Sequence, residues 1–155
     1  MLLSELLSIE RIKIPLEAQN KDDLLRELVD VAASPAGAPA RDDLLRAVRE
    51  REAVLSTGIG HGVAIPHGKS SSVGELRMAA GRAAAPVDFD ALDGQPVSLF
   101  FLLVGPESAA GPHIKALSRI SRLVRKDDVR NKLVAARNPR EFMDALKEAE
   151  SLAAA

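Results

Sequence analysis

One segment limits the possible folds more than any other. Residues 97–104 read VSLFFLLV and are apolar with a single exception. A short run of this kind is typical of a strand that is covered on both faces, as in a sheet with helices on each side. The segment therefore predicts the buried centre of a layered α/β domain.

The remaining segments alternate between strand patterns and helix patterns. Strand patterns occur at residues 11–16, 63–65 and 76–80. Helix patterns begin near Asn20, Asp42, Gly111, Asp127 and Asn138. Residues 32–40 read AASPAGAPA and predict a loop, because proline and small residues interrupt both periodicities. We therefore expect one domain over residues 1–155, an α/β fold with a central mixed β-sheet covered by helices.

The composition excludes several classes of protein. With 21 basic and 22 acidic residues, the formal net charge is −1, and the chain has no Trp, no Tyr and four Phe. A nucleic-acid-binding protein normally has a basic excess and aromatic rings on which bases stack, so we expect no nucleic-acid partner. The absence of cysteine excludes disulfides, thiolate zinc sites and thiol nucleophiles.

The apolar segments are too short for a membrane protein. The first fifteen residues contain four charged residues and no uninterrupted apolar centre, so they do not match a secretory signal. No run reaches the roughly 18 apolar residues of a membrane helix. We expect a cytoplasmic protein without an integral membrane segment.

The sequence context of His67 is compatible with a functional role for this residue. Pro66 restricts Ile65 to an extended conformation, and Gly68 allows the chain to turn directly afterwards. A histidine placed at the end of a strand is well positioned for chemistry, and its neutral ring has one nucleophilic nitrogen at pH 7. An ordinary turn histidine is the alternative interpretation.

A long block around His67 resembles a known family. Arg51-Glu52, followed by STGIGHGVAIPHG at residues 56–68, is similar to the type-2 (fructose/mannitol) EIIA domain of the bacterial phosphoenolpyruvate-dependent phosphotransferase system. The similarity continues in PVDFD at 86–90, in LDGQPV at 92–97 and at His113. It extends over about residues 3–146 and is greatest to the stand-alone nitrogen-regulatory EIIA proteins.

The resemblance implies that His67 accepts a phosphoryl group, with Arg51 and His113 beside it. Phosphorylation adds negative charge that needs donors, and the guanidinium fork of Arg51 suits two phosphoryl oxygens. His113 lies near a predicted helix N-terminus, which should lower its pKa and leave a neutral donor. Each has an alternative: Arg51 as a helix-end residue that binds carbonyls, and His113 as a capping or half-buried residue.

The other polar residues of the block are weaker candidates. Ser56 and Thr57 could donate hydroxyl hydrogen bonds to the bound phosphoryl group, or equally could stabilise their own turn. His61 stands between two glycines, and we expect it to face solvent without a direct role.

Other chemistries fit the sequence poorly. The three histidines lack the spacing of a metal site, so we expect neither a metal nor another cofactor. There is no G-x-S-x-G elbow, and Gly62 and Gly68 are one residue too far apart for a phosphate-binding P-loop. The basic residues of the helix after His113 lie on one face, which is either a solvated face or a docking surface for an acidic partner. These residues are Lys115, Arg119, Arg122 and Lys126.

The function that follows from the resemblance is a phosphotransferase-system component with a phosphohistidine intermediate. The expected donor is the phosphocarrier protein HPr or its nitrogen-branch relative, and the favoured role is nitrogen-related regulation of a target protein. The alternative is a sugar-specific EIIA component that passes the phosphoryl group to a separate EIIB of a fructose/mannitol-type transporter. A type-2 EIIB resembles a protein with a cysteine nucleophile. This chain has no cysteine, so such an EIIB does not lie within it.

Overall fold

A computed structural model describes residues 2–33 and 38–154. Its strands form one mixed sheet in the order β1-β5-β6-β3-β2, and β4 also pairs with β6. The strands are β1 (Ile12–Leu16), β2 (Gly58–Gly60), β3 (Val63–Ala64), β4 (His67–Lys69), β5 (Arg77–Val87) and β6 (Val97–Gly105). The helices are α1 (Leu3–Leu6), α2 (Lys21–Ala33), α3 (Ala38–Val54), α4 (Ala110–Leu123), α5 (Asp127–Ala135) and α6 (Pro139–Ala154), with short 3₁₀ turns at Ile9–Arg11 and Glu107–Ala109.

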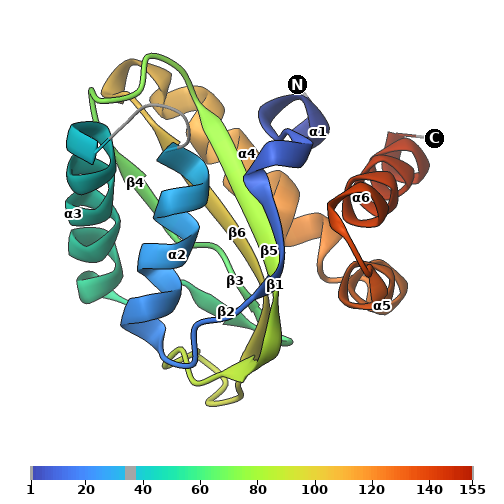
Figure 1. Ribbon diagram of the computed structural model, residues 1–155. Helices are drawn as coiled ribbons and strands as arrows, with labels where there is room; N and C mark the ends of the chain where they lie inside the picture. The colour runs from blue at the N-terminus through green and yellow to red at the C-terminus, as the bar shows by residue number, and fades with distance from the viewer. Residues whose placement is uncertain (1, 34–37, 155) are drawn as a thin grey trace.

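The predicted central strand is β6, and helices cover both of its faces (Figure 1). Its side chains alternate between two apolar layers, as expected for a period of two residues. Leu99, Phe101 and Leu103 lie in the layer that contains α1, α4, α5 and α6. Phe100 and Leu102 lie in the opposite layer with α2 and α3. The α/β fold with a mixed sheet is confirmed.

Several boundaries differ from the sequence-based predictions. The strand expected at 76–80 extends to Val87, and its register with β6 shifts between Arg82 and Val87, so the strand accommodates Pro86 near an irregularity. The glycine-rich segment at residues 58–60, for which no strand was predicted, forms β2, which pairs antiparallel with β3. Helices α2 and α3 both extend into the loop predicted over 32–40, and residues 34–37 of that loop lie outside the described residues.

The strands β3 and β4, which lie beside β6, determine where His67 lies on this fold. β3 and β4 pair in parallel with successive parts of β6: Val63 lies opposite Leu99, and His67 lies opposite Leu103. The Pro66 carbonyl between them accepts a hydrogen bond from the Leu103 N–H at 3.0 Å. This arrangement puts His67 near the start of α4, which follows β6. Within the described residues, no helix has the length and apolar character needed to cross a membrane.

Candidate functional site

His67 is the first residue of β4, not the end of the preceding strand, and Gly68 continues β4 where a turn was expected. A close backbone contact fixes the position of β4. A Cβ added to Gly68 would lie 2.9 Å from the backbone nitrogen of Val48, so α3 packs directly on the β4 backbone. Because neighbouring side chains of a strand point to opposite faces, His67 points away from α3. Its half-buried ring lies beside α4.

A backbone hydrogen bond orients the His67 ring. Nδ1 lies 2.9 Å from the Ile65 carbonyl oxygen, and a carbonyl only accepts, so Nδ1 carries the proton and Nε2 carries the lone pair. Burial lowers the pKa of His67, and the charge of Arg51 lowers it further, although the bond to Ile65 opposes the shift. The ring is therefore neutral at pH 7, with Nε2 as the nucleophilic atom.

His113 contacts His67 edge-on, with ring centroids 5.5 Å apart. It is the fourth residue of α4 and is only 2% exposed, and within residues 2–33 and 38–154 neither ring nitrogen has a hydrogen-bond partner. Burial, followed by the proximity of His67 and Lys69, lowers its pKa to about 4. The predicted direction is confirmed, but burial is the largest cause of the shift. A neutral histidine ring has one N–H donor. Burying this donor without an acceptor costs free energy unless a ligand supplies the acceptor.

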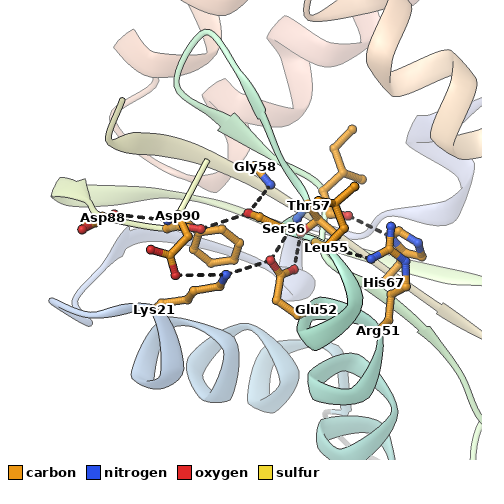
Figure 2. Close-up of polar contacts among 12 residues, drawn as sticks. Lys21, Arg51, Glu52, Leu55, Ser56, Thr57, Gly58, His67, Asp88 and Asp90 are labelled. Atoms are coloured by element: carbon orange, nitrogen blue, oxygen red, sulfur yellow. Dashed lines mark hydrogen bonds and ion pairs between the residues drawn. The ribbon is translucent and has the colours of Figure 1, made fainter. Parts of the chain in front are cut away.

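Arg51 lies in the last turn of α3 next to His67 (Figure 2). Its Nη1 donates a hydrogen bond of 2.8 Å to the Leu55 carbonyl, which is the helix-end contact considered as the alternative for this residue. Among the described residues, no carboxylate lies within ion-pair distance of the guanidinium. The two roles are compatible, because one nitrogen anchors the side chain and the other donors retain capacity for an anion.

The hydroxyls of Ser56 and Thr57 already have acceptors. Ser56 Oγ donates to the Phe89 carbonyl at 3.0 Å and accepts from the Gly58 N–H at 3.1 Å. Thr57 Oγ1 donates a hydrogen bond to the Glu52 carboxylate. Both hydroxyls therefore stabilise their own turn, and a contact with a phosphoryl oxygen would require one of these bonds to open.

His61 is separate from this group of residues. It is exposed in the β2–β3 turn with a positive φ of 58°, and it borders a hollow with Ser121, Val124 and Arg125. Within residues 2–33 and 38–154 there is no cluster of three His, Asp or Glu residues that could hold a metal ion.

The four basic residues expected on one helix do not all belong to α4, because this helix ends at Leu123 and Lys126 lies just before α5. They are of two kinds. Arg119 is tied to the buried Glu150 through a contact of 3.1 Å between Nε and Oε2. Lys115, Arg122 and Lys126 are exposed. The exposed residues are available to an acidic partner, and such a partner stays a prediction.

Sequence reasoning assigned no role to Glu52, although this carboxylate is only 7% exposed. Glu52 accepts hydrogen bonds from Thr57 and pairs with Lys21 Nζ at 3.0 Å. A signal was present, because Glu52 follows Leu44 and Val48 at intervals of four residues on the buried face of its helix. A carboxylate at such a position needs partners, and the sequence does not reveal which ones.

The chain is similar to known proteins over a length that includes all the residues of this site. The sequence model of the family described as "Phosphoenolpyruvate-dependent sugar phosphotransferase system, EIIA 2" matches residues 5–149. A nitrogen regulatory protein of Bradyrhizobium diazoefficiens is 38% identical over 146 residues, covering 94% of this chain and 95% of that protein. The fructose-specific EIIABC component of Bacillus subtilis is 36% identical over 148 residues, which are 96% of this chain but only 23% of that protein.

The fold is also similar to solved structures. The crystal structure of nitrogen regulatory protein IIA-Ntr from Neisseria meningitidis aligns with a TM-score of 0.86 and 33% identity, covering 93% of this chain and 98% of that one. The similarity in sequence and that in structure therefore extend over nearly the same length of chain.

Proposed function

Because the chain belongs to the EIIA 2 family of the phosphoenolpyruvate-dependent sugar phosphotransferase system, we propose that Nε2 of His67 accepts a phosphoryl group from an HPr-like phosphocarrier. The observation that carries the proposal is the 2.9 Å contact between Nδ1 and the Ile65 carbonyl, which leaves Nε2 as the nucleophile. Arg51 and His113 flank the same ring.

The proposed step is an in-line displacement. The Nε2 lone pair of His67 forms a bond to phosphorus while the N–P bond of the donor phosphohistidine breaks, and its electron pair returns to the donor ring. The proton on Nδ1 stays in place, where the Ile65 carbonyl stabilises the charge that the phosphorylated ring gains. Since both donor and acceptor are imidazoles, the transfer is nearly balanced in free energy and reversible.

The neighbouring side chains support the transfer by electrostatics and position. Phosphoryl transfer requires mainly alignment and stabilisation of charge on the equatorial oxygens. Arg51 provides a fixed positive charge, and neutral His113 provides an N–H donor that has no other acceptor in the part of the chain that the structure describes. Because the pKa of His113 is about 4, this ring stays neutral and does not repel Arg51.

We propose nitrogen-related regulation as the role of the phosphorylated protein, in the cytoplasm. The similarity to a nitrogen regulatory protein over 95% of its length supports this role. In the regulatory role, the charge added at His67 changes the affinity for a target protein. The similarity to a fructose-specific component supports the alternative, transfer to a separate EIIB.

The test is incubation with phosphoenolpyruvate, enzyme I and an HPr-like phosphocarrier, followed by detection of acid-labile phosphate. We expect labelling of the native chain and none of His67→Ala. Unchanged labelling of His67→Ala would overturn the assignment. Addition of a cysteine-bearing EIIB then separates the roles, because transfer to it supports the sugar-specific alternative, and phosphorylation-dependent binding without transfer supports the regulator.

A further inference from the structure

Glu52 is a buried carboxylate that the proposed transfer does not use directly. Burying a carboxylate is unfavourable unless several partners compensate it. Here the Thr57 N–H donates to Oε2 at 2.9 Å, the Thr57 hydroxyl donates to Oε1, and Lys21 Nζ lies 3.0 Å from Oε2 (Figure 2). Glu52 therefore fixes Thr57 against the end of α3.

A series of hydrogen bonds continues from Thr57 to the reactive ring. The Thr57 carbonyl accepts a hydrogen bond of 3.0 Å from the Ile65 N–H. The Ile65 carbonyl in turn accepts the Nδ1 hydrogen bond of His67 at 2.9 Å. Each of the two intermediate residues is held by both its N–H and its carbonyl, so the position of Glu52 is transmitted through Thr57 and Ile65 to His67.

The same carboxylate also influences Arg51. The Leu55 carbonyl that anchors the guanidinium lies in the short segment between Glu52 and Thr57. The hydrogen bonds between Glu52 and Thr57 close this segment into a loop, and the closed loop holds the Leu55 carbonyl in place. The proposed acceptor and its proposed charge stabiliser thus depend on one side chain.

Lys21 holds the other side of Glu52. Besides the 3.0 Å contact, Lys21 Nζ lies 3.6 Å from Asp90 and 4.8 Å from the centre of the Phe89 ring. Lys21 therefore connects the first turn of α2 to residues that follow β5. The charge of Glu52 is compensated without any contribution from Arg51, which leaves Arg51 available to an anion.

We propose that Glu52 is a positioning residue that selects the Nδ1–H tautomer and the orientation of His67. It acts through Thr57 and Ile65, and it holds Arg51 through Leu55. The proposal rests on the proposed phosphorylation of His67 for its functional meaning, but the tautomer is a property of the unphosphorylated protein. This series of hydrogen bonds holds the His67 ring in position. It does not relay a proton, because the N–H and the carbonyl of one residue belong to different peptide groups.

The experiment measures the His67 tautomer by ¹⁵N NMR and the phosphorylation rate as a function of phosphocarrier concentration. In Glu52→Leu we expect a mixture of tautomers and a rate reduced about 10-fold, with the half-saturating phosphocarrier concentration unchanged, because the ring is misplaced while the docking surface stays intact. Glu50→Gln is the matched control, since Glu50 is an exposed carboxylate of the same helix.

Three further variants separate positioning from general loss of stability. Thr57→Val removes the hydroxyl but retains both backbone hydrogen bonds, so the Nδ1–H tautomer should persist. Phe142→Leu weakens the core beneath α6, away from the site, and should lower the unfolding temperature without changing the tautomer. Glu52→Gln retains an acceptor for the Thr57 N–H but loses the ion pair with Lys21. Its fraction of the Nδ1–H tautomer should therefore lie between those of the native chain and Glu52→Leu.

The outcomes distinguish this inference from the proposed function. A folded Glu52→Leu with the native tautomer overturns the inference and leaves the phosphorylation of His67 intact. If Glu52→Leu does not fold, Glu52→Gln and Lys21→Met decide, and a native tautomer in both overturns the inference. Absence of labelling in the native chain, together with the expected change of tautomer, overturns the proposed function instead.

Discussion

The imidazole rings of His67 and His113 meet edge to face, with centroids 5.5 Å apart and planes inclined by 66°. The two rings come from β4 and from the first turn of α4. Two cationic rings at this distance would repel each other, and burial lowers the pKa of both. The arrangement therefore favours two neutral rings at pH 7, which divide the roles of nucleophile and donor in the proposed transfer.

Removing Arg51 should slow phosphorylation and change the titration of His67. Loss of a preorganised charge near the transferred group typically costs 10²-fold or more, and because Arg51 is also partly solvated we expect about 10- to 100-fold in Arg51→Ala. The charge of Arg51 lowers the pKa of His67, so the variant should show a higher pKa by NMR titration. An unchanged rate and an unchanged titration would contradict the placement of this guanidinium.

The buried state of His113 should make the protein less stable as the pH falls. An unfolded histidine binds a proton near pH 6.5, whereas folded His113 stays neutral down to about pH 4. Between these values the unfolded state binds more protons, so the free energy of unfolding falls by up to about 1.4 kcal/mol per pH unit for this residue.

His113→Gln provides the comparison for that titration. Urea unfolding at a series of pH values should give a flatter dependence for the variant between pH 6.5 and 4 than for the native chain. His67 contributes in the same direction in both proteins, because burial lowers its pKa as well. Identical slopes would show that His113 is not titrating from a buried state.

A methyl group at residue 68 should destabilise the fold. In Gly68→Ala the new Cβ would lie 2.9 Å from the Val48 nitrogen and 3.0 Å from the Ala47 carbonyl carbon, and both atoms belong to the α3 backbone. Relief of this overlap requires α3 to shift from β4, at a cost of about 1–3 kcal/mol in thermal or urea unfolding. Gly74→Ala is the control, because no atom of the described residues lies within 4 Å of its added Cβ, and equal effects would rule out the close packing.

His61 should be dispensable for phosphorylation. It lies in the β2–β3 turn and borders a hollow that His67 does not line. Asn tolerates the positive φ of 58° at this position, so His61→Asn should retain both the fold and the rate of labelling. A strongly reduced rate, measured with the same phosphocarrier, would show that the turn takes part in the transfer.

The sequence predicted the elements with strong periodicity better than the connections between them. β6 and the starts of α2 and α6 follow directly from local pattern, and Asn20 and Asn138 accept capping hydrogen bonds from the N–H groups of Asp23 and Glu141. The pairing of β2 with β3 was not predictable, because glycines at Gly58 and Gly60 carry no strand periodicity.

The residues of the candidate site could be predicted from the sequence, but the contacts that support them could not. The resemblance to a known family indicated His67, Arg51 and His113, and the fold brings these three side chains together. The role of Glu52 depends on long-range hydrogen bonds to backbone groups, which no local pattern encodes. The competing uses of the Ser56 and Thr57 hydroxyls could be resolved only by seeing which acceptors lie nearby.

The most direct test of the account is to locate the phosphoryl group on the phosphorylated protein. Two-dimensional ¹⁵N NMR of the chain, labelled through phosphoenolpyruvate, enzyme I and an HPr-like phosphocarrier, identifies both the histidine and the ring nitrogen. The account predicts phosphorus on Nε2 of His67, with the proton still on Nδ1. Phosphorus on His61, on His113 or on Nδ1 of His67 would contradict it.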